Sequence, residues 1–190
     1  MFRIRALLAA LCLSTASVPA IAETTYESSS DNIQDHIELL NTLEEMGVNV
    51  QINNPNICQR EPTNVAGFWM GSQKLFVLCQ QAIRNSKFPV YDGRIQQASD
   101  DDLDTIRHEA HHVIQDCMNG DMDGSLVEYL SDDNKEDFYQ FYPEWKQNYI
   151  RRQYADETPQ IIQLEIEAWA VADLISAEHI EEVLIRECSE

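Results

Sequence analysis

Two histidines and a glutamate, spaced H-E-x-x-H over residues 108–112, are the residues of this chain whose types and spacing favour metal chemistry. On a helix, His108 and His112 lie one turn apart on one face, so both imidazoles can reach a single metal ion. Catalytic zinc has three protein ligands and an open position for water, whose pKa it lowers to about 7. Glu109 is then placed to act as general base. We predict one zinc ion per chain, with His111 behind the ligands or at the surface.

A third zinc ligand has to come from another segment, and Glu165 and Glu167 are the candidates. Glu165 shares a helix face with small and apolar residues, where an ionised carboxylate costs several kcal/mol unless it is paired or bound to a metal. Glu167 lies about 200° further round the helix and is more easily solvated. We therefore favour Glu165 as the third ligand and keep Glu167 as the alternative.

The motif falls within the clearest predicted helix of the chain. Ser99 followed by three aspartates is typical of a helix N-terminus, because the hydroxyl caps free N–H groups and acidic side chains favour the positive end of the helix dipole. Apolar residues from Leu103 to Cys117 then recur at helical spacing and form one stripe. The stripe predicts a core-facing side, with the two histidines on the opposite face.

The rest of the pattern predicts an α+β fold, in which a small sheet of three to four strands packs on the motif helix and further helices follow. Helices are predicted from apolar residues three and four apart, and strands from alternation. The expected elements are a helix at 32–46, a strand at 48–52, hairpin strands at 65–70 and 75–79, a loop at 88–98, the motif helix from 99, helical stretches from 126 and across 138–154, and helices at 159–175 and 178–187.

The first 22 residues predict a signal peptide. Arg3 and Arg5 precede a run rich in leucine and alanine that is too short to span a bilayer, and a small-x-small cleavage pattern ends at Ala22. We therefore expect a soluble protein that is exported to the periplasm or the extracellular space. Beyond the signal peptide we expect a flexible leader at 23–31 and a single domain at 32–190.

The chain is strongly acidic, with 13 Lys and Arg against 33 Asp and Glu and a formal net charge of −20. Nucleic-acid binding depends on basic side chains that neutralise phosphates, and attraction to anionic membrane surfaces depends on the same residues. We therefore expect neither nucleic acid nor a membrane as partner. The oligomeric state is not predicted.

Four cysteines lie beyond the predicted signal peptide: Cys58, Cys79, Cys117 and Cys188. In an oxidising compartment, an even number without C-x-x-C spacing favours disulfides over a zinc site. We predict a Cys58–Cys79 bond beside the hairpin. We also predict a Cys117–Cys188 bond that ties the C-terminal helix to the motif helix.

Two weaker patterns concern further sites. Residues 119–124 match the first half of a calcium-binding loop, but Leu130 stands where a bidentate Glu belongs. We favour a turn rich in Gly and Asp there, with Ca²⁺ as the lesser alternative. A Tyr or His that stabilises negative charge on an attacked carbonyl oxygen is also expected. The sequence leaves its identity open among Tyr129, Tyr139, Tyr142, Tyr149, Tyr154 and His179.

The H-E-x-x-H motif, together with Glu165-x-Glu167-Ala168, resembles the gluzincin metallopeptidases, especially the small single-domain minigluzincins. The resemblance implies a zincin-like fold, with His108, His112 and Glu165 as zinc ligands and Glu109 as general base. The hairpin also resembles the sheet of that family. In that family, the edge strand of the sheet pairs with an extended peptide substrate through main-chain hydrogen bonds.

The function expected from these patterns is that of an exported zinc metallopeptidase, which hydrolyses peptide bonds in a peptide or protein substrate. Two alternatives stay open. The first is a zinc hydrolase of non-peptide amides, and the second is a catalytically silent secreted binding protein that retains the fold. The sequence predicts no side-chain preference.

Overall fold

The computed structural model describes residues 29–58, 65–80, 95 and 98–189. The chain divides into a unit at Met1–Asp31 and a compact unit at Asn32–Glu190. The predicted signal peptide and most of the leader at 23–31 lie outside the described residues, as does nearly all of the predicted loop at 88–98. The compact unit contains the H-E-x-x-H motif and the four cysteines of the predicted disulfides.

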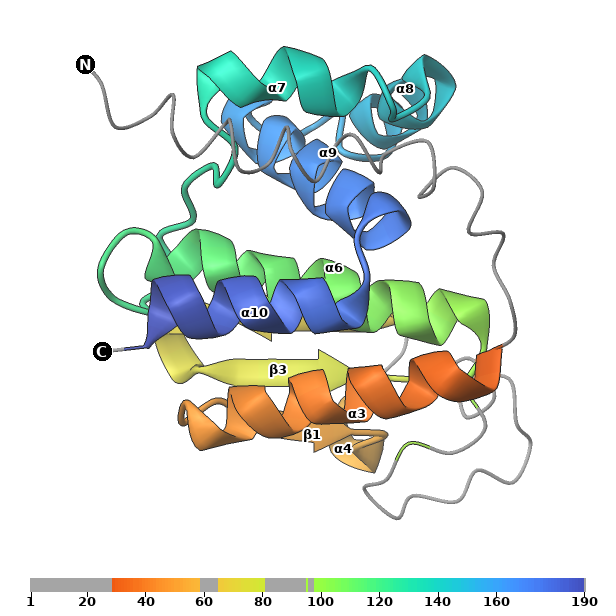
Figure 1. Cartoon of the computed structure of the whole chain (residues 1–190), viewed down its shortest axis with the longest axis vertical. Coiled ribbons are helices and arrows are strands. Elements are labelled where there is room, and N and C mark those ends of the chain that lie inside the picture. Colours follow the sequence, from red (N-terminus) through yellow and green to blue (C-terminus); the bar gives the residue numbers. More distant parts are fainter. Residues whose placement is uncertain (1–28, 59–64, 81–94, 96–97, 190) are drawn as a thin grey trace. The chain divides into compact units, whose positions relative to one another are not determined.

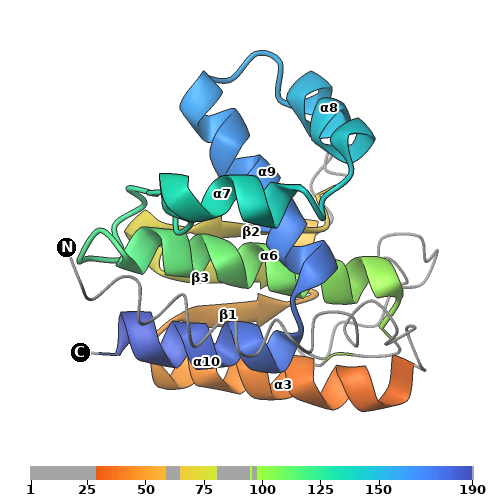
Figure 2. The same cartoon turned by 45° about the horizontal axis from the view of Figure 1, so that its top comes forward.

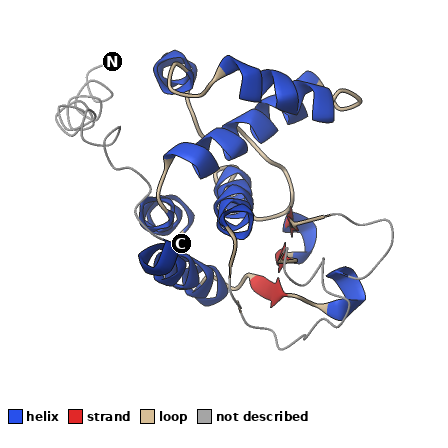
Figure 3. Cartoon of the chain, turned by 90° about the vertical axis from the view of Figure 1, so that its right-hand side faces the viewer, coloured by secondary structure: helices blue, strands red, loops and turns tan. Residues whose placement is uncertain are grey.

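The fold is α+β, as predicted, and combines helices with a small mixed sheet (Figures 1 and 3). Its elements in chain order are α3 (Ser29–Glu45), β1 (Asn49–Ile52), α4 (Pro55–Cys58), β2 (Gly67–Met70), β3 (Leu75–Leu78), α6 (Asp100–Cys117), α7 (Asp132–Tyr139), α8 (Glu144–Gln153), α9 (Pro159–Leu174) and α10 (Ala177–Cys188). No helix among the described residues is long and apolar enough to cross a membrane.

The three described strands are ordered β1-β3-β2. β1 runs parallel to β3, with Asn49 opposite Leu75, and β2 runs antiparallel to β3, with Gly67 opposite Leu78. The predicted hairpin is therefore confirmed, and so is the strand before it. β2 is an edge strand, and no described strand pairs with its outer side.

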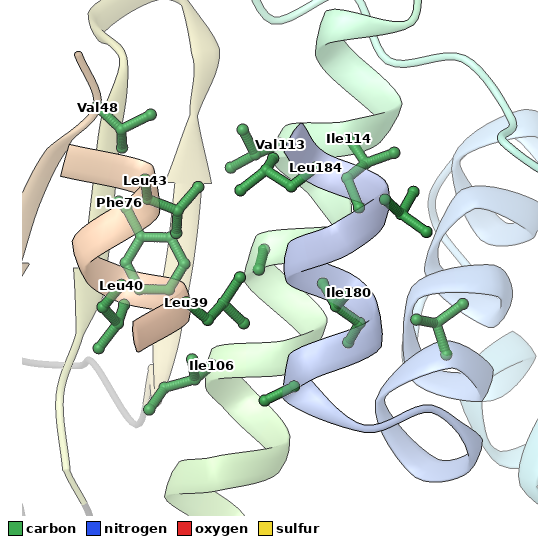
Figure 4. Packing of buried hydrophobic residues seen from close by; sticks show 14 of the residues in the cluster. Leu39, Leu40, Leu43, Val48, Phe76, Ile106, Val113, Ile114, Ile180 and Leu184 are labelled. Carbon is green, nitrogen blue, oxygen red and sulfur yellow. The ribbon is translucent and has the colours of Figure 1, made fainter. Parts of the chain in front are cut away.

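The main hydrophobic core lies between the sheet and helices α3, α6 and α10 (Figure 4). Four elements contribute its largest enclosed side chains. These are Leu39 and Leu43 from α3, Phe76 and Leu78 from β3, Ile106 and Ile114 from α6, and Ile180 and Leu184 from α10. Each side chain of this size stabilises the fold by about 1.5–3 kcal/mol when it leaves water. This core holds α6, the helix that carries the motif, in place.

Helix α6 begins after the predicted N-cap Ser99, which forms a capping box with Asp102. The Ser99 hydroxyl accepts the Asp102 N–H, and the Asp102 carboxylate accepts the Ser99 N–H. The predicted apolar stripe faces the core, but burial extends beyond it, because all residues from 105 to 116 are buried. The sheet and α10 cover part of the helix, and α9 packs against the remainder (Figure 2). The histidine face therefore lies inside the molecule.

A second, smaller core joins α8 and α9. Its buried members are Tyr142, Ile150, Ile166 and Ala170. The helical region predicted across 138–154 is two helices, because α7 ends at Tyr139 and α8 begins after Pro143. Proline has no N–H to continue a helix but suits its start. α9 thus has the motif helix on one side and α8 on another.

The helical stretch predicted from Leu126 is wrong, because residues 126–131 form no helix. The Val127 N–H donates to the Gln115 carbonyl of α6. The N–H groups of Tyr129 and Leu130 donate to the Glu167 carboxylate of α9. These donors are satisfied by the neighbouring helices α6 and α9, so the segment needs no helical hydrogen bonds of its own.

Both predicted disulfides, Cys58–Cys79 and Cys117–Cys188, are present. Replacing Cys117 and Cys188 together by Ala should lower the free energy of unfolding by about 4 kcal/mol, because the bond restricts the unfolded chain over a long loop. The Cys58/Cys79 double variant should lose less, about 3 kcal/mol, because its loop is shorter. The sequence separations are 71 and 21 residues. Urea unfolding measures both losses, and the reverse order would contradict the prediction.

Candidate metal centre

His108, Glu109 and His112 of α6 meet Glu165 where α9 packs on that helix. The Nε2 atoms of the two histidines are 3.1 Å apart. The Glu165 carboxylate lies 3.4 Å from Nε2 of His108 and 3.5 Å from Nε2 of His112. The structure thus brings together the three residues predicted as ligands, with the predicted base beside them.

These separations fit a tetrahedral metal centre. Ligand atoms bound at about 2.0–2.1 Å in a tetrahedral arrangement lie about 3.3 Å from one another. In addition, Glu165 Oε2 is buried and receives no well-formed hydrogen bond from the described residues. Among these residues, His108, Glu109 and His112 form the one group of His, Cys, Asp and Glu compact enough to hold a metal ion, and Glu165 extends it. The cluster could therefore hold a metal ion.

Glu167, the alternative ligand, lies on the other flank of α6. Its side chain is completely buried, so the expectation of a solvated carboxylate is wrong. It accepts hydrogen bonds from His111 Nε2 at 2.8 Å and from Gln115 Nε2 at 3.0 Å, in addition to two backbone N–H groups. His111 is buried by this contact, behind the ligands and not at the surface.

Glu165 and Glu167 both reach α6 because they lie on either side of the stripe of α9 residues that packs against that helix. The buried residues Leu164, Ala168 and Val171 form this stripe. At 100° per residue, Glu165 and Glu167 lie roughly 80° to either side of it. The two side chains therefore hold α6 from both flanks, and only one of them meets the histidine pair.

The electrostatics of the cluster follow from burial and from the Glu165 charge. Burial lowers the pKa of His108 to about 4. Burial also acts against a charged His112, but the carboxylates of Glu165 and Glu109 outweigh it and raise the pKa of His112 to about 9. Although burial opposes its charge, the two histidines hold the pKa of Glu165 well below its usual range. The Glu165 charge therefore favours positive charge at the histidine pair, which a bound metal ion would supply in place of a proton.

Glu109 has the electrostatics of a proton-transfer group. Its side chain is buried, and this burial raises its pKa to about 7, against the opposing effects of His112 and a hydrogen bond with the Trp69 backbone. A carboxyl group whose pKa lies near the working pH can both accept and return a proton.

A cavity of about 210 Å³ lies over the cluster. It is lined by Gly67, Phe68 and Trp69 of β2, His108, Glu109 and His112 of α6, and Leu126, Tyr154 and Glu165. A Cβ atom on Gly67 would lie 2.7 Å from Thr105 Cγ2 and 3.2 Å from Glu109 Cγ. Because a larger residue would collide with α6, glycine allows the edge strand to lie directly beside the cluster.

Tyr154 is the one of the six candidate charge-stabilising residues that lines the cavity. It follows α8 directly, and burial together with the Glu165 carboxylate raises the pKa of its phenol. The others are used elsewhere or face solvent: Tyr129 with Arg186, Tyr139 with Gln163, Tyr142 in the second core, Tyr149 exposed, and His179 with Glu182. Tyr154 is therefore the candidate that the tertiary structure selects.

Three further residues of the site are not among the predicted ligands, base or charge-stabilising residues. The Trp169 ring packs on His108 with ring centroids 4.2 Å apart. Gln115 contacts His112, and Leu126 forms a wall of the cavity. Trp169 follows Glu165 by four residues and Gln115 follows His112 by three, so helical spacing alone could have indicated both. No sequence signal pointed to Leu126.

The segment 119–131, here called the wall loop, begins with the favoured turn, where Gly120 and Gly124 have positive φ angles. The buried Asp116 carboxylate accepts the N–H groups of Asp123 and Gly124 and also Nε1–H of Trp69. No group of metal-binding side chains other than the one on α6 occurs within the described ranges. Asp116 thus ties the start of the wall loop to the edge strand.

Comparison with known families places most of the chain in one group. Residues 19–189 match the model of a family described as Domain of unknown function (DUF8637). The chain belongs to this family. No curated protein and no solved structure matches it significantly. The DUF8637 match covers the candidate metal centre, both flanking carboxylates and the wall loop.

Proposed function

We propose that the protein is an exported zinc metallopeptidase of the gluzincin type. One observation carries the proposal: two imidazole nitrogens and a partly buried carboxylate lie 3.1–3.5 Å apart, beside a glutamate whose pKa burial raises to about 7. A nitrogen and carboxylate ligand set with an adjacent base is what zinc hydrolases use.

Each residue has a distinct role in this proposal. His108, His112 and Glu165 would hold the zinc ion. A bound zinc ion would polarise the carbonyl of the scissile bond and lower the pKa of water in its open position. Glu109 accepts a proton from the attacking water and returns it to the leaving amine. The Tyr154 hydroxyl donates a hydrogen bond to the carbonyl oxygen as negative charge develops there.

The edge strand supports a peptide substrate. Ala66 and Cys79 form a hydrogen-bonded pair, since the Cys79 N–H donates to the Ala66 carbonyl. Because such pairs alternate along antiparallel strands, the backbone groups of Gly67 and Trp69 point away from β3. They face the outer edge beside the cavity, with which no described strand pairs. The Trp69 N–H meets Glu109 there, and the remaining groups can bind an extended peptide as a further strand.

Metal analysis of the purified mature chain tests the zinc site. We expect one zinc per chain in the wild type and loss of zinc in His112→Ala and Glu165→Ala, because each change removes a ligand. Glu157→Ala is the matched control. Glu157 is exposed just before α9, the helix that carries Glu165, so its replacement should leave the zinc content unchanged. A wild-type chain without zinc after reconstitution would refute the proposal.

Replacing Tyr154 by Phe should lower kcat for peptide hydrolysis by about 10²-fold, because one hydrogen-bond donor to the developing charge is lost. Zinc content should not change, since the ligands are intact. Tyr149→Phe, which alters an exposed tyrosine on α8, is the control. Equal kcat values in the two variants would exclude this role for Tyr154.

A further inference from the structure

Gln115 lies behind the metal ligand His112 and is completely buried. Its Nε2 lies 3.0 Å from Glu167 Oε1 and 3.2 Å from the Leu164 carbonyl oxygen. Its Oε1 lies 2.7 Å from Nδ1 of His112. The side chain therefore bridges α6 and α9 directly behind the ligand.

The hydrogen-bond chemistry of these partners allows one arrangement. A backbone carbonyl can only accept hydrogen bonds, and an ionised carboxylate likewise. The amide NH₂ of Gln115 must therefore face Leu164 and Glu167, and its oxygen must face His112. An oxygen cannot donate, so Nδ1 of His112 must carry the hydrogen, which leaves Nε2 to face His108 and Glu165.

Glu167 is the acceptor on which this order depends. Besides Gln115, the donors to its carboxylate are His111 Nε2 and the N–H groups of Tyr129 and Leu130. The last two belong to the wall loop, which also presents Leu126 to the cavity. A single carboxylate thus orients a ligand through Gln115 and holds the loop that bounds the cavity.

The other histidine is held differently. His108 Nδ1 is buried and has no hydrogen-bond partner among the described residues, while its ring packs on Trp169.

We propose that Gln115, anchored by Glu167, is a positioning residue that holds His112 with its proton on Nδ1 and so directs Nε2 to the metal ion. This inference rests on the proposed zinc site.

The first test uses NMR to determine which ring nitrogen of His112 carries the proton in the wild-type chain. Long-range ¹H–¹⁵N correlation spectra of the zinc-loaded mature protein should show His112 protonated at Nδ1 and coordinated through Nε2. A proton on Nε2 with coordination through Nδ1 would overturn the inference. If the wild type binds no zinc, the proposed function fails separately. The Nδ1 proton is then read in the metal-free chain, where its absence would overturn the inference.

The second test measures zinc affinity by competition with a chromophoric chelator. Gln115→Met keeps the side-chain length but removes the acceptor, and it should raise the zinc Kd by about 10–100-fold. Gln163→Met is the matched control, because Gln163 lies on α9 outside the cavity lining and loses only its hydrogen bond to Tyr139 of α7. Its Kd should stay within about twofold of wild type.

Equal zinc Kd values for Gln115→Met and Gln163→Met, with wild-type zinc binding intact, would overturn the inference and leave the proposed function standing. If Gln115→Met does not fold, the wild-type spectra decide alone. The two readouts thus separate an effect on the ligand from a general loss of structure.

Discussion

Replacing Glu109 by Gln should reduce peptide hydrolysis by about 10²–10⁴-fold, because the amide cannot accept a proton from the attacking water. Zinc content should remain at one per chain, since Glu109 is not among the three proposed ligands. Glutamine has nearly the same volume, and the Trp69 backbone N–H that faces this side chain can still donate to an amide oxygen. The expected result is therefore a folded, metal-loaded and inactive chain.

The measurement combines cleavage of an unfolded protein substrate with metal analysis of the same preparation. Detection of new amino termini shows that peptide bonds are cleaved. Hydrolysis of amides without new amino termini would favour the alternative of a zinc hydrolase of non-peptide amides. Glu157→Gln provides the control, because it changes an exposed glutamate and should keep full activity. Wild-type activity in Glu109→Gln would refute the proposed mechanism.

Replacing Glu167 by Gln should lower the free energy of unfolding by about 3–5 kcal/mol, because buried donors lose a charged acceptor. The wild-type carboxylate accepts from His111, Gln115, Tyr129 and Leu130. An amide group turns its NH₂ toward one of these donors and leaves it unpaired. Urea unfolding at neutral pH measures the loss.

Glu182→Gln is the control for this measurement. Glu182 pairs with His179 at the surface, and both side chains are more than half exposed. Exposed ion pairs contribute roughly 0–1 kcal/mol, so the control should lose little. Similar losses in the two variants would contradict the view that Glu167 anchors α6 and the wall loop.

The pH dependence of the Glu167→Gln effect has a definite sign. Burial opposes the charge of Glu167, but its hydrogen bonds, with His111 foremost, lower its pKa below the ordinary value of 4.5. A carboxyl whose folded pKa is depressed stabilises the fold above the unfolded pKa and loses that contribution as pH falls. The difference in the free energy of unfolding between wild type and Glu167→Gln should therefore be largest above about pH 4.5 and should decrease as the pH falls below that value. A difference that grows in acid would contradict this assignment.

Local patterns were sufficient wherever one segment determines its own structure. The N-cap at Ser99, the hairpin and the strand before it depend on neighbours in sequence, and all are present. The H-E-x-x-H spacing likewise places His108 and His112 together on any helix. The disulfide pairing could also be predicted, because only certain pairs join elements that were already expected to be neighbours.

The packing of α9 on α6 could not be read from sequence periodicity. Two glutamates separated by one residue point about 200° apart on a helix, and periodicity alone suggests that only one faces inward. The stripe of Leu164, Ala168 and Val171 runs between them, so both reach α6, where Glu167 is completely buried and Glu165 is partly buried. For the same reason the histidine face of α6 lies inside the molecule.

By itself, the sequence determined the helix, the paired histidines with their adjacent glutamate, the small sheet and the two disulfides, because each follows from local spacing or from simple pairing. Only the tertiary structure decided which glutamate meets the histidines, that Glu167 and Gln115 stand behind them, and that Tyr154 and Leu126 line the cavity. These outcomes depend on how elements far apart in the chain cross, and a helix period carries no information on where another helix will pack.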